Sequence, residues 1–156
     1  MSEILGLGHD VVDVDAFSQQ WHEPSSTMRK LFSVRELRQC TMRAALKHDE
    51  EALHAAARWA GKESVIKAWS EAIADGTVPF TIDSVPWNEI EILDDSRGRP
   101  QVILGESLAQ SLTRSIAARS PVTWHISLSH DGSIASAVAI LVHSSDHEGA
   151  DTGCAL

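Results

Sequence analysis

The chain contains 156 residues, 43% of them hydrophobic, which suits one domain with its own hydrophobic core. A net charge of −9 argues against a nucleic-acid-binding protein, whose affinity rests on neutralising phosphates. No apolar run is long enough to cross a membrane, and the N-terminus lacks the features of a secretory signal. The two cysteines are widely separated and indicate neither a disulfide framework nor a zinc site, which suits a protein of the reducing cytoplasm.

The N-terminal part of the chain predicts a strand followed by short helices. Apolar residues alternate loosely over 4–14, and two glycines in that stretch indicate a bulge or a close backbone approach. Asp13 or Asp15 can cap a short helix that runs to about Trp21. A further turn or helix is expected to open at 24–27.

A basic segment comes next in the chain. Ser33, with Glu36 three residues later, is a capping-box signature that predicts a third short helix. Residues 29–47 carry a local charge of +5, because Glu36 is the one acid among six basic side chains: Arg29, Lys30, Arg35, Arg38, Arg43 and Lys47. This segment is either a docking surface for an anionic partner or an ordinary solvated helix face.

An alanine-rich stretch over 49–74 predicts one long helix with a narrow buried stripe, ended by Asp75-Gly76. Glu63 and Lys67 lie four residues apart and share a face, and Lys62 lies about 100° round the helix, from where it could approach the same ligand. A carboxylate flanked by lysines suits a divalent metal next to phosphate oxygens. The simpler alternative is a solvent-exposed ion pair worth a few tenths of a kcal/mol.

The second half predicts two hairpins and another helix. The expected elements are a strand over 87–93, a turn over 94–100, a return strand over 101–104, a helix over 106–119, and strands on either side of an Asp131-Gly132 turn that extend to 142. In the strand before that turn, Trp124, Ile126 and Leu128 should face one way and the residues between them the other. The sequence thus predicts an α+β domain over 1–142, with an antiparallel sheet wrapped around a long helix, and a polar tail over 143–156.

Five motifs together resemble those of one family. They are GLGHDVVDVDAF at 6–17, FSVREL at 32–37, RWAGKESVIKAW at 58–69, GRP at 98–100 and ISLSH at 126–130. In this order they resemble the motifs of bacterial holo-(acyl carrier protein) synthases, the small 4′-phosphopantetheinyl transferases. The resemblance extends over residues 3–142 and implies a homotrimer with active sites between neighbouring subunits.

The resemblance also implies a reaction. 4′-Phosphopantetheine would pass from coenzyme A to a serine of an apo acyl carrier protein, or of a carrier domain of a fatty acid synthase, releasing adenosine 3′,5′-bisphosphate. Asp10 and Glu63 match the carboxylates that bind the metal ion, expected to be Mg²⁺. Lys62 and Lys67 match phosphate-contacting lysines, and Arg58 could assist them. Metal ions and lysines suit this chemistry because negative charge develops on phosphate oxygens.

Three further residues match the part of the family site that contacts the nucleotide of coenzyme A, namely Pro100, Ser129 and His130. Glu63 is also a candidate base for the attacking serine, although a metal-bound carboxylate is a poor free base. Ala16 departs from the pattern, because many members have a carrier-binding arginine there. The basic segment could replace that contact.

Two other functions remain open from the sequence. A coenzyme A-binding or nucleotide-binding oligomer could keep the fold and lack transfer activity, although both matching carboxylates speak against this. His9 beside Asp10 also suggests a zinc-dependent or iron-dependent phosphohydrolase, since imidazole suits those metals. No second well-spaced histidine supports that alternative.

Overall fold

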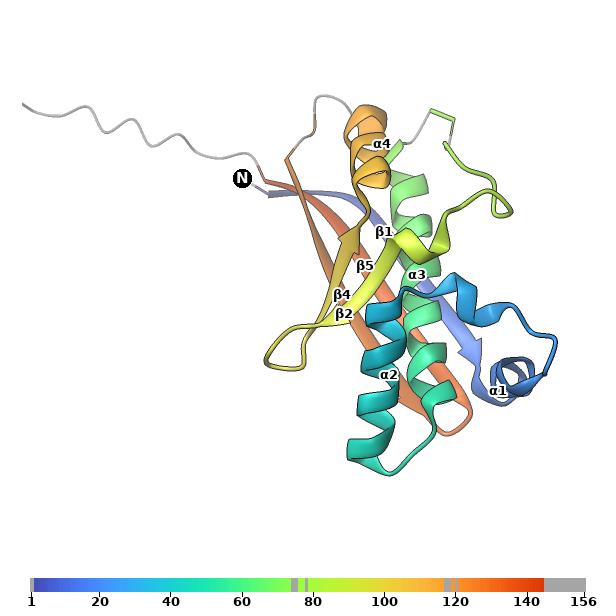
Figure 1. The fold of residues 1–156 in the computed structure, drawn as a ribbon. Helices are drawn as coiled ribbons and strands as arrows, with labels where there is room; N and C mark the ends of the chain where they lie inside the picture. Colours follow the sequence, from blue (N-terminus) through green and yellow to red (C-terminus); the bar gives the residue numbers. More distant parts are fainter. Residues whose placement is uncertain (1, 74–75, 78, 117–118, 120, 145–156) are drawn as a thin grey trace, which may run out of the picture.

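The fold is built around one long helix, α3 (Glu51–Ile73), which runs through the middle of the molecule (Figure 1). The computed structural model describes residues 2–73, 76–77, 79–116, 119 and 121–144. Fourteen residues of α3 are buried, among them most of its alanines, because small side chains let other elements pack closely on several sides of the helix. The expected long helix is therefore confirmed, but its buried surface extends over several sides, where the sequence predicted a narrow stripe.

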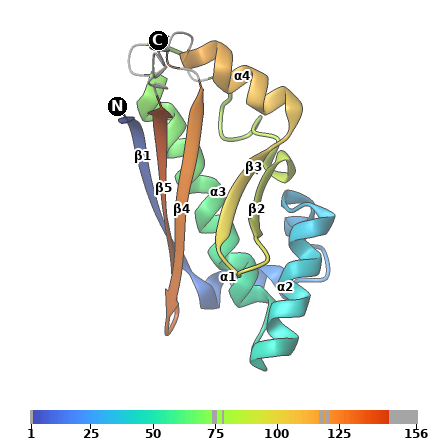
Figure 2. The same cartoon turned by 90° about the vertical axis from the view of Figure 1, so that its left-hand side faces the viewer.

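Two antiparallel sheets enclose α3 (Figure 2). On one side, β1 (Ser2–Asp13), β5 (Ile134–Ser144) and β4 (Val122–Asp131) form a sheet in the order β1-β5-β4. On the other side, β2 (Ile90–Asp94) and β3 (Pro100–Leu104) form a hairpin. The expected α+β fold is confirmed, with two sheets where the sequence predicted one.

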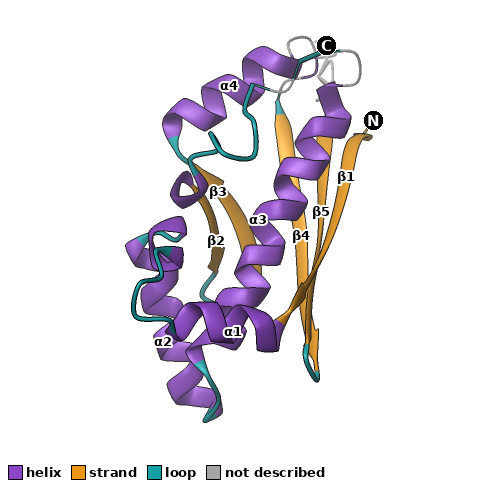
Figure 3. Cartoon of the chain, turned by 90° about the vertical axis from the view of Figure 1, so that its right-hand side faces the viewer, coloured by secondary structure: helices purple, strands orange, loops and turns teal. Residues whose placement is uncertain are grey.

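Helices cover the ends and the remaining side of this sandwich (Figure 3). The helix α1 (Val14–His22) follows β1, α2 (Val34–Lys47) packs against α3, and α4 (Glu106–Ile116) lies at the opposite end of the molecule from α2. Two 3₁₀ helices, η1 (Met28–Leu31) and η2 (Trp87–Glu89), connect these elements.

Local hydrogen bonds fix where the first helices begin. The side chain of Asp13 accepts a hydrogen bond from the backbone N–H of Ala16 and caps α1. At the start of α2, Ser33 and Glu36 accept hydrogen bonds from each other's backbone N–H groups, so the predicted capping box is confirmed. The helix α2 ends at Lys47, and its C-cap residue His48 adopts the left-handed conformation with φ of 55°.

Two glycines allow β1 to lie directly on the backbone of α3. A Cβ atom at Gly8 would lie 1.9 Å from the carbonyl oxygen of Ser64, and one at Gly6 would lie 2.0 Å from that of Ala68. No side chain fits in that space, so only glycine permits this contact. The contact holds the middle of β1 against the second half of α3.

The burial of β4 follows the predicted alternation. Trp124, Ile126 and Leu128 pack against the core, and the residues between them are exposed on the outer face of the sheet. The tight turn at Gly132, with φ of 55°, joins β4 to β5 as expected. Among the described residues, no helix is both long and apolar enough to span a bilayer.

Some expected boundaries differ from the observed ones. The helix α3 ends at Ile73, α4 ends at Ile116, and β5 continues to Ser144, two residues into the expected tail. The predicted stop residue Asp75, the end of the helix expected to reach residue 119, and most of the tail, 145–156, fall largely outside the described residues.

Candidate functional site

Asp10 and Glu63 come together where β1 passes α3, and Lys67 lies beside them. The Nζ atom of Lys67 donates hydrogen bonds to Oδ1 of Asp10 at 2.8 Å and to the carbonyl oxygen of His9 at 2.9 Å. The Asp10 carboxylate is largely buried, and about half of the Lys67 side chain is exposed. The sequence predicted that these three residues lie close together, and this geometry is consistent with that prediction.

The two carboxylates repel each other electrostatically. Burial raises the pKa of Glu63 above its ordinary value, and the negative charge of Asp10 raises it further. Lys67 and the indole of Trp59 act in the opposite direction. A cation between the two carboxylates would relieve this repulsion, so the pair can hold either a proton or a metal ion.

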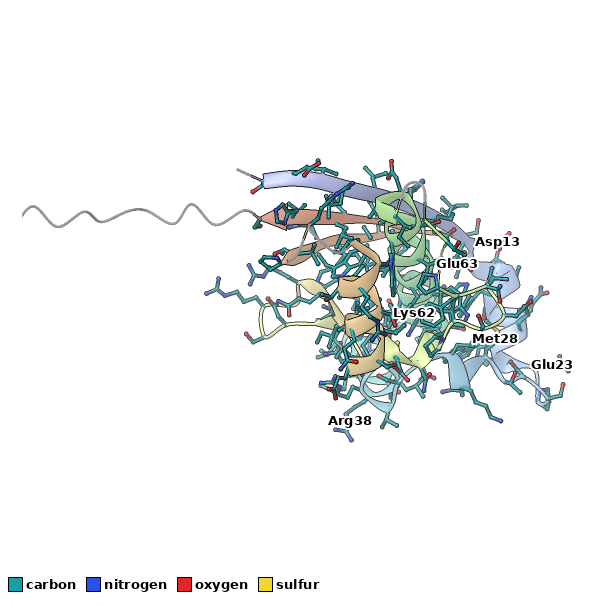
Figure 4. The ribbon with its side chains drawn as sticks, turned by 90° about the horizontal axis from the view of Figure 1, so that it is seen from above. Asp13, Glu23, Met28, Arg38, Lys62 and Glu63 are labelled. Carbon is teal, nitrogen blue, oxygen red and sulfur yellow. The ribbon has the colours of Figure 1, made fainter. Side chains whose placement is uncertain are left out.

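A cavity of about 380 Å³ adjoins the carboxylate pair. Its wall includes Asp10, Glu63 and Trp59, and residues of α1 and η1 such as Ala16 and Met28. Figure 4 shows Glu63 on the side of α3 that faces Asp13 and the start of α1. Ala16, which stands where the family resemblance implies an arginine, is one of the residues that line this cavity.

Lys62 does not join this group, which differs from the sequence-based expectation. Its side chain is fully buried, and Nζ donates hydrogen bonds to Oε2 of Glu36 at 2.8 Å, to the carbonyl oxygen of Trp87 at 2.7 Å, and to that of Ile90. Burial lowers the pKa of Lys62, and Glu36 counteracts that effect. The side chain points into the core between α3 and α2 (Figure 4). All three protons of its ammonium are engaged inside the fold, so Lys62 holds elements together.

A second, basic cavity of about 160 Å³ lies between α2, α3 and the β2–β3 turn. Two of the three predicted nucleotide-contacting residues, Pro100 and His130, line it, together with Arg58, which was expected to assist the phosphate-contacting lysines. Arg58 is 97% buried, as its relative exposure is 3%, and it donates hydrogen bonds to Oδ2 of Asp94 at 3.0 Å and to the carbonyl oxygen of Ile92 at 3.1 Å. Ser129 is exposed on the outer face of the sheet and is not among the residues that line this cavity.

Sequence reasoning missed three residues of this cavity, Arg43, Lys47 and His54. Burial lowers the pKa of His54, which favours its neutral form, and its Nε2 atom lies 2.7 Å from Oδ1 of Asp49. Arg43 and Lys47 are four residues apart on α2, and His54 and Arg58 are four apart on α3. These two pairs could have indicated a shared basic site, because the two residues of each pair lie on one face of their helix and the two helices are consecutive in the chain.

The basic segment 29–47 is partly neutralised within the fold. Arg29 pairs with Glu51, Arg35 with Glu91, and Arg43 with Asp94. Arg38 makes no ion pair with any residue that the structure describes, and its side chain extends outward from α2 (Figure 4). Within this segment the arginines therefore differ in their availability to a partner.

Comparisons with known proteins identify the family. Residues 6–139 match the 4′-phosphopantetheinyl transferase superfamily. The chain belongs to this superfamily. It is 54% identical over 144 residues to a holo-[acyl-carrier-protein] synthase of Bifidobacterium animalis subsp. lactis, an alignment that covers 88% of this chain and 97% of the relative. It is 37% identical to the corresponding enzyme of Corynebacterium glutamicum strain ATCC 13032, covering 88% of this chain and 98% of that one.

Solved structures agree with this assignment to the phosphopantetheinyl transferases. The chain matches a Chronobacterium ammoniagenes ACPS–CoA complex with a TM-score of 0.77 and 34% identity, covering 90% of this chain and 98% of that one. It matches an acyl carrier protein synthase of Mycobacterium tuberculosis with a TM-score of 0.65 and 35% identity, covering 89% and 97% respectively. The expected family resemblance is thereby confirmed.

In this member of the superfamily the two cavities lie at opposite edges of one sheet. Asp10 is on β1, and Ser129 and His130 are on β4, with β5 between them. Two strand spacings separate these edges by roughly 10 Å. On α3, Arg58 and Glu63 are five residues apart, which places them about 140° apart around the helix. One chain thus presents the carboxylate pair and the basic cavity in different directions.

Proposed function

We propose that this chain is a holo-(acyl carrier protein) synthase. It transfers 4′-phosphopantetheine from coenzyme A to a serine of an apo acyl carrier protein, or of a carrier domain of a fatty acid synthase, and releases adenosine 3′,5′-bisphosphate. The observation that carries this proposal is the group of Asp10, Glu63 and Lys67 where β1 crosses α3. Membership of the superfamily and the close relative named as such a synthase support it.

The carboxylate pair fits Mg²⁺. This ion prefers hard oxygen ligands and commonly takes one or two protein carboxylates together with phosphates and water. Asp10 and Glu63 supply two such carboxylates, and the electrostatic repulsion between them favours the binding of a cation. When bound there, Mg²⁺ would neutralise negative charge that develops on the phosphates of coenzyme A.

Side chains of the protein would contact the phosphate and accept the proton of the attacking serine. Lys67 carries a positive charge beside Asp10 and is half exposed, so it can reach a phosphate oxygen. Glu63 is the candidate to accept the proton of the attacking serine, directly or through a metal-bound water. Lys62 is left out of the phosphate-binding set, because its ammonium is enclosed in the core.

The basic cavity would hold the nucleotide part of coenzyme A. Arg43, Lys47 and Arg58 bring three positive charges to it and Asp94 brings one negative charge, so an anionic group is favoured there. Pro100 and His130 offer flat surfaces for the rest of the nucleotide. Ser129, on the exposed face of the same strand, would reach a ligand only from outside this cavity.

We further propose that three chains form a ring with active sites between neighbours. The two cavities of one chain face different directions, so a neighbour's basic cavity has to supply the nucleotide site beside each carboxylate pair. The outer face of β1 supports such an assembly, because it exposes Ile4, Leu7 and Val11 at 66%, 51% and 51%. We expect the enzyme to work in the cytoplasm, with carrier proteins of fatty acid synthesis.

Incubation of the protein with coenzyme A, Mg²⁺ and an apo acyl carrier protein tests the activity. The carrier should gain the mass of one phosphopantetheine group, as measured by mass spectrometry. Matched reactions without Mg²⁺ test the metal requirement, and light scattering should report about three chains per particle. An unmodified carrier under these conditions would refute the proposed function.

A further inference from the structure

A negatively charged residue stands inside the basic cavity. Asp94 is the last residue of β2, and it lines this cavity together with Arg43, Lys47 and Arg58. Its side chain is largely buried, so water screens its charge only weakly. A carboxylate in this place opposes the binding of a phosphate group, because both are anions. Asp94 therefore acts against the electrostatic attraction that the three basic residues provide.

One oxygen atom of Asp94 binds two arginines of the cavity. Its Oδ2 atom accepts a hydrogen bond from Nε of Arg43 at 2.9 Å and another from Nη2 of Arg58 at 3.0 Å. The two guanidinium groups come from different helices, α2 and α3. Guanidinium groups bind carboxylates and phosphates through the same N–H donors. Asp94 thus makes with both arginines the kind of contact that a phosphate oxygen of a ligand would make.

The backbone of Asp94 is fixed by a side chain of α2. Nε2 of Gln39 donates a hydrogen bond to the carbonyl oxygen of Asp94 at 3.0 Å, and Oε1 of Gln39 accepts one from its N–H at 2.8 Å. The same Oε1 atom also accepts a hydrogen bond from Arg58 at 3.2 Å. This places the end of β2 beside α2, as Figure 2 shows. A phosphate that enters the cavity must therefore share the two arginines with a carboxylate that remains there.

The two arginines have further hydrogen bonds that do not depend on the carboxylate of Asp94. Arg58 donates through Nε to the carbonyl oxygen of Ile92 at 3.1 Å, and Arg43 donates through Nη2 to that of Gly98 at 3.2 Å. These acceptors are backbone atoms, so they remain when the side chain of residue 94 is changed. The negative charge of Asp94 is thus not needed to orient the arginines, and its main effect in the cavity is electrostatic.

The product that leaves this cavity carries the same nucleotide as the substrate. In the proposed reaction, adenosine 3′,5′-bisphosphate keeps the nucleotide part of coenzyme A with its phosphates. A cavity that binds the substrate through these groups therefore also binds the product. Contacts that are equally strong before and after transfer do not accelerate the chemical step, and slow release of product can limit turnover. An anion of the protein that competes with the phosphate weakens the binding of the product.

We propose that Asp94 competes with a phosphate group of the nucleotide for Arg43 and Arg58, and thereby promotes release of adenosine 3′,5′-bisphosphate. This inference rests on the proposed transferase function and adds to it a residue that controls how tightly the nucleotide is held. Asp94 is not a catalytic residue in this proposal, because it acts on the ligand through the two arginines and through its own charge.

The variant Asp94→Asn removes the charge and keeps an oxygen acceptor for the arginines. In isothermal titration calorimetry it should bind adenosine 3′,5′-bisphosphate about tenfold or more tightly than wild type, because close like charges strongly reduce affinity. In steady-state assays, the KM for coenzyme A and the inhibition constant of the bisphosphate should both fall. Asp95→Asn is the matched control, since Asp95 pairs with Arg99 at 2.7 Å and neither residue lines the basic cavity. It should bind both nucleotides as wild type does.

Thermal unfolding distinguishes this competition from a purely structural role. Arg58 is buried, and Asp94→Asn leaves its charge less well compensated, so the melting temperature of the free variant should fall. The same concentration of adenosine 3′,5′-bisphosphate should nevertheless raise the melting temperature of the variant more than that of wild type, because a tighter ligand stabilises the folded chain more. Asp94→Ser, which also lacks the charge, should show the same gain in affinity. If neither variant folds even with the bisphosphate present, Asp94 is required for the fold and the inference is wrong.

The remaining outcomes separate this inference from the proposed function. A wild-type protein that modifies no carrier refutes the function, and the inference fails with it. An active wild-type protein whose Asp94→Asn variant binds adenosine 3′,5′-bisphosphate no more tightly overturns the inference alone. An equal gain of affinity in Asp95→Asn would also overturn it, because the effect would then come from the net charge of the chain and not from the position of Asp94.

Discussion

The buried pair of Lys62 and Glu36 offers a direct test of whether Lys62 stabilises the fold or binds phosphate. Both side chains are completely buried, and the Lys62 ammonium joins α3 to α2, η2 and β2 through hydrogen bonds to Glu36, Trp87 and Ile90. Replacement of Lys62 by methionine keeps a similar volume but leaves the Glu36 carboxylate without its partner. We expect Lys62→Met to destabilise the fold strongly.

The expected loss of stability in Lys62→Met follows from the interactions that Glu36 keeps. Glu36 keeps its hydrogen bonds from the backbone N–H groups of Ser33 and Ile92, but its charge is no longer compensated. Removing one partner of a buried ion pair costs about 3–5 kcal/mol. For a chain of this length, each kcal/mol lowers the melting temperature by roughly 2–4 °C, so the melting temperature should fall by about 6–20 °C.

Urea unfolding followed by circular dichroism measures the free energy of unfolding of each variant. The double variant Lys62→Met/Glu36→Gln removes both charges and keeps hydrogen-bonding capacity at position 36, so it should recover part of the loss. A matched surface change, Lys30→Met, should leave the stability close to that of wild type. If Lys62→Met were as stable as wild type and bound coenzyme A poorly, Lys62 would contact phosphate as the sequence suggested, and our assignment of its structural role would be wrong.

Four other measurements test the site and the packing. Glu63→Gln should reduce phosphopantetheine transfer about 10²-fold or more while circular dichroism stays native, and full activity would exclude Glu63 from the reaction. Gly8→Ala should lower the free energy of unfolding by about 1–3 kcal/mol or more in urea titrations, because its Cβ has no space against α3; a stable variant would contradict the close contact. Burial lowers the pKa of His54, so the imidazole binds a proton more readily in the unfolded chain than in the folded one. The free energy of unfolding should therefore decrease as the pH falls below about 6.5, and this decrease should be smaller in His54→Asn. Burial raises the pKa of the Cys40 thiol to about 11, so in Cys154→Ser iodoacetamide should label Cys40 at pH 8 only after unfolding, as mass spectrometry would reveal.

Sequence patterns predicted the elements of this fold well where the signal was local. The capping box at Ser33, the Asp131-Gly132 turn and the alternation of Trp124, Ile126 and Leu128 depend on neighbouring residues and were correct. The two glycines of β1 were correctly taken as a close approach or a bulge, but their partner, the backbone of α3, could not be named from the sequence.

The site was less predictable, because it depends on distant contacts. Helical spacing correctly placed Glu63 and Lys67 on one face. The same spacing could not predict the hydrogen bond from Lys62 to Glu36, because Glu36 lies 26 residues earlier in the chain. Ion pairs between distant residues likewise decided which arginines of segment 29–47 remain available, since Glu91 and Asp94 come from β2. Such pairings appear only when the chain has folded.

The placement of the two cavities at opposite edges of the β1-β5-β4 sheet has a genetic consequence. In the proposed ring, each active site takes its carboxylates from one chain and its nucleotide cavity from the next. If these sites work as proposed, a chain damaged at Glu63 and another damaged at His130 would each be inactive alone. Made together in equal amounts and assorted at random into rings, they would recreate intact sites at about a quarter of all interfaces. Two inactive alleles of this gene would therefore complement each other within a single cell.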